Sequence, residues 1–280
     1  MRAPTGVQFA LSKSTPNGDA IAVITEVAAS LRVLSIGGIE LTEPYGVDVV
    51  PPFCDGIVLV PWPNRVEDGR WIHEGAAQAL DITEPALHNA LHGLLRDRPY
   101  LLAEHTPEAV TLAATVHPTR GYPFTLDTTV RYELVDDGIR VTHGVVNVGE
   151  KRAPYAVGTH PFLRLGEVPT YELTLALAAG TRFETDARLN PIRESSVDGT
   201  DYDLRSGRLV AGLDLDDAFG GVTPVDGVSR HRLTAPDGRF VELWQESDFA
   251  YVQVFTTRIF PKDGGLGTAI AVEPMSAPPN

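Results

Sequence analysis

Thr128-Thr-Val-Arg-Tyr-Glu-Leu134 and Ile139-Arg-Val-Thr-His-Gly-Val-Val146 stand on either side of an Asp-Gly pair at 137–138. Along both stretches, β-branched and aromatic residues alternate with polar ones, as they do in a sheet with one buried face. Asp-Gly favours the tight turn of a hairpin, because glycine adopts a positive φ without steric cost. The two stretches therefore predict an antiparallel β-hairpin.

The same pattern recurs through the chain and predicts an all-β fold. His231–Thr234 and Arg239–Trp244 flank another Asp-Gly turn. With 26 glycines and 22 prolines, long helices are not expected, and the best helical candidate is residues 85–95, where three leucines would share one face. No linker, charge block or repeat marks a boundary. We predict one large antiparallel β domain over residues 1–280.

Composition restricts the class of partner. The hydrophobic content of 43% and charged content of 21% are those of a soluble globular protein, and the formal net charge is −14. A nucleic acid or an anionic membrane needs a positive field, so a neutral small molecule is the expected partner. With no signal-like N-terminus and no long apolar stretch, we expect a cytoplasmic protein, either a monomer or a homodimer.

Cysteine and histidine usage gives no indication of a metal site. Cys54 is the only cysteine, so no intrachain disulfide forms. We interpret it as a small buried residue and not as a nucleophile. His88 and His92 have a spacing that suits a metal on a helix, but no cysteine and no second histidine pair accompanies them. We expect no metal ligands here.

Two titratable residues each follow a strand-like run and directly precede a proline. His160 stands before Pro161, and Glu273 before Pro274. Proline cannot continue an inner ladder, so each side chain is expected at a strand end. A lone histidine is usually structural, but partial desolvation would raise the pKa of a carboxyl in this position toward that of a general base. Each residue is therefore a candidate for acid or base chemistry, with a structural role as the alternative.

Other segments leave alternatives open. Arg65 lies beside Asn64 in a turn-rich segment with two tryptophans, which suits either a sugar site or a hairpin with core tryptophans. Asp216 and Asp217 form an acidic pair. The chain has no phosphate-binding loop, dinucleotide fingerprint or Gly-x-Ser-x-Gly elbow. Phosphoryl and hydride transfer therefore lose their main support.

Five separated motifs, in this order, resemble the aldose 1-epimerase (galactose mutarotase) family. They are residues 60–66 (Val-Pro-Trp-Pro-Asn-Arg-Val), 89–93 (Asn-Ala-Leu-His-Gly), 158–162 (Gly-Thr-His-Pro-Phe), 216–219 (Asp-Asp-Ala-Phe) and 272–279 (Val-Glu-Pro-Met-Ser-Ala-Pro-Pro). The resemblance implies a large antiparallel β-sandwich, the galactose mutarotase-like supersandwich, with a sugar site on one broad face. It also implies an isomerase that interconverts the anomers of a free aldohexose such as glucose or galactose.

The resemblance assigns roles to five residues. It makes Glu273 the general base and His160 the general acid, while Arg65, His92 and one aspartate of the acidic pair hold sugar hydroxyls. Asp216 is the better match, being three residues before a phenylalanine, with Asp217 the alternative. No metal or organic cofactor is required. The chemistry needs a charged histidine beside an ionised glutamate, and a nearby carboxylate would help keep His160 protonated.

Two departures and three alternatives accompany the resemblance. The chain ends seven residues after Glu273, where family members usually continue for another strand or two, and it has Pro161 where galactose mutarotases tend to have an aromatic hydroxyl residue. A preference for galactose is therefore not implied. Alternatives are a hexose 6-phosphate 1-epimerase using Arg96 and Arg98, a catalytically silent carbohydrate-binding module, and a glycoside hydrolase with two carboxylates.

Overall fold

The computed structural model describes residues 3–262 and 264–280, and almost all of its regular structure is β-strand. All paired strands in these residues are antiparallel, which confirms the predicted all-β class. Short 3-10 helices interrupt them at η1 (Pro52–Cys54), η2 (Thr170–Glu172) and η3 (Val210–Gly212). In these ranges no helix has the length and apolar character needed to cross a bilayer.

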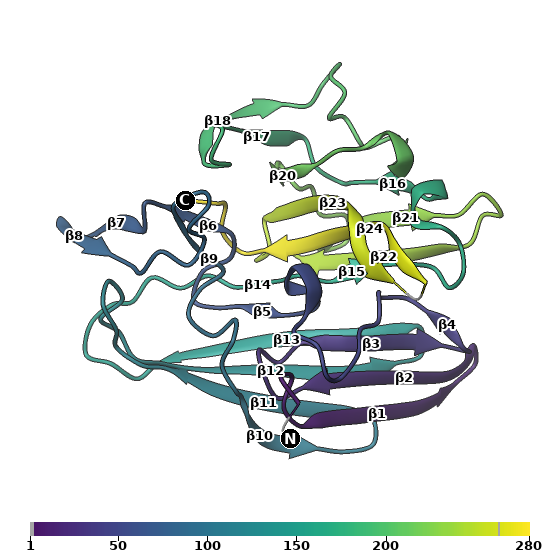
Figure 1. Cartoon of the computed structure of the whole chain (residues 1–280), viewed down its shortest axis with the longest axis horizontal. Helices are drawn as coiled ribbons and strands as arrows, with labels where there is room; N and C mark the ends of the chain where they lie inside the picture. The colour runs from purple at the N-terminus through teal and green to yellow at the C-terminus, as the bar shows by residue number, and fades with distance from the viewer. Residues whose placement is uncertain (1–2, 263) are drawn as a thin grey trace.

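Two four-stranded sheets form the first sandwich, at the bottom of Figure 1. One consists of β1 (Gln8–Thr15), β2 (Gly18–Thr25), β3 (Leu31–Ile36) and β4 (Ile39–Glu40). The other consists of β10 (Leu101–His105), β11 (Ala109–Val116), β12 (Leu126–Val135) and β13 (Gly138–Asn147). Alternate residues of each sheet point inward and share one core, in which Leu11, Ile24, Leu112 and Tyr132 are fully buried.

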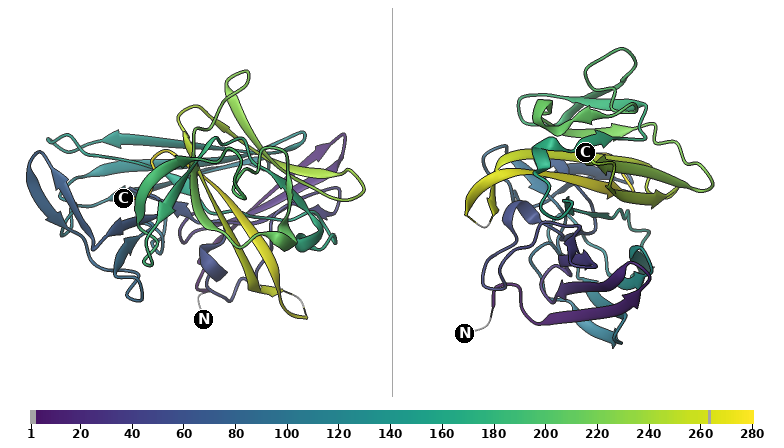
Figure 2. Two further views of the ribbon diagram at one scale, coloured as in Figure 1. Left: turned by 90° about the horizontal axis from the view of Figure 1, so that it is seen from above. Right: turned by 90° about the vertical axis from the view of Figure 1, so that its right-hand side faces the viewer.

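An eight-stranded sheet dominates the other half. In spatial order its strands are β18 (Pro191–Ser196), β17 (Thr181–Thr185), β20 (Asp216–Gly220), β23 (Tyr251–Lys262), β24 (Gly265–Met275), β14 (Gly158–Thr159) and β5 (Val58–Leu59), with β15 (Phe162–Leu163) also beside β24. A four-stranded sheet packs on it, formed by β19 (Arg208–Leu209), β16 (Thr174–Ala176), β21 (Val228–Thr234) and β22 (Phe240–Glu246). The right-hand view of Figure 2 shows the layers stacked on one another.

Two small ribbons complete the described strands. β6 (Arg65–Glu67) pairs with β9 (Asn89–Leu91), and β7 (Arg70–His73) pairs with β8 (Ala76–Ala79). Both lie near the C-terminus of the chain, at the left of Figure 1. The backbone N–H of Asn280 donates to the carbonyl of Arg65, which ties this corner to the end of the chain.

Both predicted hairpins are confirmed. β12 and β13 pair in register up to Val135 and Gly138, and β21 pairs with β22 along its whole length. The signals were local: strand-forming residues in alternation on either side of an Asp-Gly turn. Such hairpins can be predicted without knowing the rest of the fold.

The helix predicted over residues 85–95 is wrong. The segment makes turns and then enters β9, where pairing with β6 buries Asn89 and Ala90. His88 and His92 have φ values of 58° and 61°, which a right-handed helix does not allow. Sheet pairing and burial override the leucine periodicity, and the i, i+4 relation of the two histidines disappears with the helix.

Leu112 provides a test of the first sandwich. Its side chain is 0% exposed at the centre of β11, so Leu112→Ala should lower the free energy of unfolding by about 2–5 kcal/mol through lost burial and a cavity. Leu101→Ala is the matched control: this leucine is 75% exposed on β10, and its loss should change stability by less than about 0.5 kcal/mol. Urea titration measures both, and equal effects would contradict the core assignment.

Candidate active site

A row of three polar side chains crosses the centre of the eight-stranded sheet. Gln253 on β23 is paired directly with Glu273 on β24. On the other side of β24, Gly158 pairs with Met275 and Phe162 with Ala271. The register is the same before and after the break between β14 and β15, and it places His160 opposite Glu273.

The two prolines act differently on their strands. Pro161 separates β14 from β15, as predicted, so His160 lies where the ladder is interrupted. β24 continues through Pro274 and ends at Met275, so Glu273 lies inside a strand, and the expectation that Pro274 would end it is wrong. Glu273 is consequently flanked by strands on both sides.

A clamp from residues 55–57 fixes the backbone around His160. The N–H of Gly56 donates to the carbonyl of His160 at 2.8 Å, and the N–H of His160 donates to the carbonyl of Ile57 at 3.1 Å. Asp55 Oδ1 accepts from the N–H of Phe162 at 3.2 Å. The imidazole also stacks on Phe162, with ring centroids 5.4 Å apart. These contacts leave the histidine ring little freedom.

His160 and Glu273 form a buried contact pair. His160 Nε2 and Glu273 Oε1 are 3.3 Å apart, and the two side chains are only 7% and 2% exposed. Burial raises the pKa of Glu273 well above its ordinary value, with the charge of Asp216 adding to it. Burial lowers the pKa of His160 to about 4, with the charge of Arg65 adding to it.

These shifts oppose the charged pair that the chemistry was expected to need, a protonated His160 beside an ionised Glu273. The neighbouring carboxylate was expected to keep the imidazole charged, but burial disfavours both charged forms at once. The favoured arrangement is a neutral pair, in which one proton resides on Glu273 and the imidazole is uncharged. A single proton is then available for transfer between the two groups.

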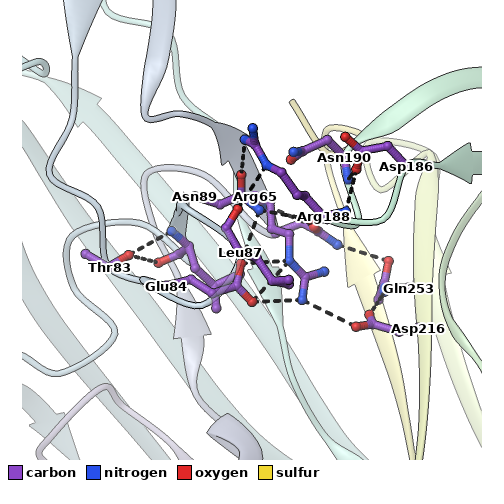
Figure 3. A network of polar contacts seen from close by, with 12 residues as sticks. Arg65, Thr83, Glu84, Leu87, Asn89, Asp186, Arg188, Asn190, Asp216 and Gln253 are labelled. Carbon is purple, nitrogen blue, oxygen red and sulfur yellow. Dashed lines mark hydrogen bonds and ion pairs between the residues drawn. The ribbon is translucent and has the colours of Figure 1, made fainter.

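Arg65 and Asp216 meet beside this row. Arg65 Nη2 donates to Asp216 Oδ2 at 3.3 Å, and Gln253 Nε2 donates to Asp216 Oδ1 at 2.7 Å (Figure 3). The Asn64 side chain donates to Gln253 at 3.0 Å and accepts from the backbone N–H of Arg65. A continuous set of hydrogen bonds thus connects Arg65 with the residue paired to Glu273.

The alternation along β20 separates the two aspartates. Asp216 points toward Arg65, while Asp217 points to the other face, where it accepts from Arg182 Nε at 2.7 Å. Adjacent residues of a strand face opposite ways, so only one of the pair can be near His160 and Glu273. The structure places Asp216 there.

His92 completes the group from the end of β9. Its ring meets that of His160 edge-on, with centroids 5.5 Å apart and an interplanar angle of 88°. Burial lowers the pKa of His92 well below the ordinary value, and the charge of Arg65 adds to this shift. The structure therefore brings together all five residues that the sequence singled out, from five different segments.

Several buried polar atoms at this site have no partner among residues 3–262 and 264–280. They are His92 Nδ1, His160 Nδ1 and Glu273 Oε2. Buried polar atoms are nearly always hydrogen-bonded, to protein, to water or to a ligand. A ligand carrying several hydroxyl groups, each both donor and acceptor, matches this set of atoms.

The tryptophans belong to the core. Trp71 packs on Tyr122 and Phe124 and donates from Nε1 to the carbonyl of Gly121, and Trp62 also packs on Tyr122. Both are partly buried against the first sandwich. The structure supports core packing for the two tryptophans, whereas Asn64 and Arg65 of the same segment lie in the polar network of the site.

Three residues position the others: Glu84 and Gln253, which sequence reasoning missed, and Asn64, which it named beside Arg65 without a separate role. Glu84 binds the guanidinium of Arg65, and the other two connect it to the central row. Glu84 and Gln253 lie outside the five motifs, whereas Asn64 lies inside the first one and directly precedes Arg65. Cys54, which was expected to be a small buried residue, is half-buried, and burial raises the pKa of its thiol to about 11.

Comparisons with known proteins identify relatives over most of the chain. The family model described as aldose 1-epimerase matches residues 40–278. A curated Escherichia coli K12 protein, named uncharacterized protein YihR, is 33% identical over 264 residues, which cover 94% of this chain and 83% of that protein.

Solved structures share the fold. The GalM/aldose epimerase homologue from C. elegans has a TM-score of 0.82 at 19% identity, covering 96% of this chain and 90% of that one. A putative aldose 1-epimerase from Escherichia coli K12 has a TM-score of 0.80 at 17% identity, covering 98% and 89%. These similarities establish the galactose mutarotase-like architecture.

The raised pKa of Glu273 predicts a pH-dependent effect of Glu273→Gln on stability. A carboxyl whose pKa is higher in the folded chain lowers stability once the unfolded group ionises, above about pH 4.3. This loss of stability grows as the pH rises toward the pKa of the folded chain. The amide of the Glu273→Gln variant does not ionise, so the variant has no such loss. The stability of Glu273→Gln relative to the wild type should therefore increase from about pH 5 to about pH 8.

Urea titrations at several pH values measure this difference. Glu104→Gln, which alters an exposed carboxylate on β10, is the matched control and should show a much smaller change. A Glu273→Gln difference that is constant with pH would mean that burial does not hold the proton on Glu273.

Proposed function

Because the chain belongs to the aldose 1-epimerase family, we propose that it interconverts the α and β anomers of a free aldohexose by acid and base catalysis. The observation that carries the proposal is the buried contact of His160 Nε2 with Glu273 Oε1 at 3.3 Å. A general acid and a general base act on two oxygens attached to the same carbon, O1 and the ring oxygen O5. Because His160 and Glu273 are in contact, they can reach O1 and O5 of the same sugar.

The reaction follows from the positions of the two groups. With the proton on His160, the Glu273 carboxylate removes the proton of the O1 hydroxyl while the imidazolium protonates O5. The C1–O5 bond breaks, C1 becomes an aldehyde carbon, and rotation about C1–C2 presents its other face. The reverse transfers then close the ring as the other anomer. Only protons are exchanged between the sugar and the two side chains, so the proposed chemistry needs no metal or organic cofactor.

The neutral resting pair adds one step before ring opening. The proton must pass from Glu273 to His160 across their contact, because burial favours the uncharged forms. Sugar hydroxyls entering the site would hydrogen-bond to Glu273 Oε2 and the other unpartnered atoms and so favour the ionised carboxylate. Substrate binding thereby prepares the acid and the base.

Arg65, His92 and Asp216 are proposed to hold the remaining sugar hydroxyls. Arg65 faces the carboxylates of both Glu84 and Asp216, so its positive charge is already balanced. This supports an uncharged sugar over a sugar phosphate in that part of the site. A protein that only bound sugar would not need an acid and a base in contact.

Glu273→Gln and His160→Gln test the catalytic pair. Each should lower kcat at least about a hundredfold, because general acid or base catalysis typically contributes that much. Polarimetry of freshly dissolved α-glucose, α-galactose and α-glucose 6-phosphate measures the rates, with Glu104→Gln as an active control. Sugar binding without faster mutarotation by the wild type would instead indicate a binding protein, and near-normal turnover by Glu273→Gln would contradict the proposed mechanism.

Arg65→Ala tests the binding role. Loss of a charge-assisted hydrogen bond to a sugar hydroxyl, about 1.5–3 kcal/mol, should raise KM about ten- to a hundredfold. The value of kcat should stay within a few-fold, since Arg65 is not placed to transfer a proton. The same polarimetric assay over a range of sugar concentrations separates the two constants. A fall in kcat at unchanged KM would assign Arg65 to the chemical step.

A further inference from the structure

Glu84 holds most of the Arg65 guanidinium. Arg65 Nε donates to Glu84 Oε2 at 3.0 Å and to Oε1 at 3.3 Å, and Nη2 donates to Oε1 at 3.1 Å (Figure 3). Nη2 also donates to Asp216 Oδ2 at 3.3 Å. Within the described part of the chain, Nη1 has no acceptor. It is therefore the nitrogen left free to donate to a ligand.

Glu84 is itself fixed by the loop that carries it. The backbone N–H groups of Glu84 and Asn89 each donate to the other residue's carbonyl, at 3.0 and 3.2 Å. Asn89 Nδ2 also donates to Glu84 Oε2 at 3.3 Å. The Glu84 carboxylate is thus held in place from its own loop, and its side chain is only 17% exposed.

A second loop, from the other half of the molecule, braces this one. The carbonyl of Arg188 accepts from Asn89 Nδ2 at 3.0 Å, and Arg188 Nε donates to the carbonyl of Leu87 at 3.1 Å. Figure 3 shows Arg188 lying over Asn89 and Leu87, with Glu84 and Arg65 next to them. The position of Glu84 therefore depends on contacts from both halves of the chain.

The geometry also determines the local charge. Burial lowers the pKa of Arg65, and the hydrogen bonds and charges of Glu84 and Asp216 raise it by more, so the guanidinium stays fully protonated. Without Glu84, Asp216 would be the one carboxylate partner of Arg65 left among residues 3–262 and 264–280, and the planar guanidinium could turn to form a two-pronged pair with it. That rotation would carry Nη1 away from its present direction.

We propose that Glu84 is a positioning residue for sugar binding. It holds Arg65 so that Nη1 faces a sugar hydroxyl, and its carboxylate balances the charge of the guanidinium. This inference rests on the proposed function. Glu84 acts through Arg65, without touching the sugar itself. Its removal should therefore weaken sugar binding and leave the chemical step unchanged.

A double-mutant cycle between Glu84 and Arg65 tests the proposal. Glu84→Ala should raise KM for the preferred aldose about five- to tenfold, with kcat within about twofold of the wild type. In an Arg65→Ala background, the same change should raise KM by less than about twofold, because the residue that Glu84 positions is already absent. Glu84→Gln, which keeps an oxygen acceptor but no charge, should give an intermediate KM.

A matched control comes from the first sandwich. Glu104 accepts from Arg131 Nη1 at 2.8 Å on strands far from the site, so Glu104→Ala also removes a carboxylate from an arginine pair. It should leave KM and kcat unchanged. Thermal unfolding of each variant confirms that it is folded, and if Glu84→Ala does not fold, the cycle is completed with the near-isosteric Glu84→Gln.

The outcomes separate this inference from the proposed function. Equal increases in KM in both backgrounds, or a loss confined to kcat, would overturn the positioning role while leaving the mutarotase activity intact. If the wild type shows no turnover, the proposed function fails, and the cycle is measured as Kd by calorimetry with the same aldoses: a non-additive cycle supports the positioning role, and an additive one overturns it. If the wild type neither turns over nor binds any of the aldoses, both are overturned.

Discussion

The register of β24 between its neighbours is the constraint on which the site depends. It places Gln253 on one side of Glu273 and His160 on the other, so that His160 and Glu273 lie opposite each other in a single row. A shift of β24 by one residue would turn Glu273 to the opposite face of the sheet. Buried residues on both faces of β24, Ile270 and Val272 on one and Ala269 and Ala271 on the other, fix this register.

The same burial makes the charged forms of both His160 and Glu273 unfavourable. Enclosing a carboxyl and an imidazole among apolar residues shifts both pKa values toward the neutral forms. Backbone strain is found nearby as well: Asn64 and His92 adopt φ values of 55° and 61°, which cost most non-glycine residues about 1–3 kcal/mol. Backbone strain and desolvation thus coincide at this site.

How far the sequence could predict this protein depended on the range of each interaction. The Asp-Gly hairpins were predicted correctly because their signals lie within about twenty consecutive residues. The helix over residues 85–95 was wrong because the pairing of β9 with β6, a partner more than twenty residues away, outweighed the local leucine pattern. The effect of burial on the pKa of His160 was not predicted either, since burial in the folded chain is not visible in the residues beside it.

The sequence by itself determined the all-β class, the family resemblance and the five residues singled out for the site, because motif order and alternation are properties of the linear chain. Only the tertiary structure decided which aspartate faces Arg65, that His160 contacts Glu273, and that Glu84 holds the guanidinium. Glu84 lies in none of the five motifs, and its proposed role arises from a contact between loops. Strand register and burial are set by the packing of distant segments, which no local pattern specifies.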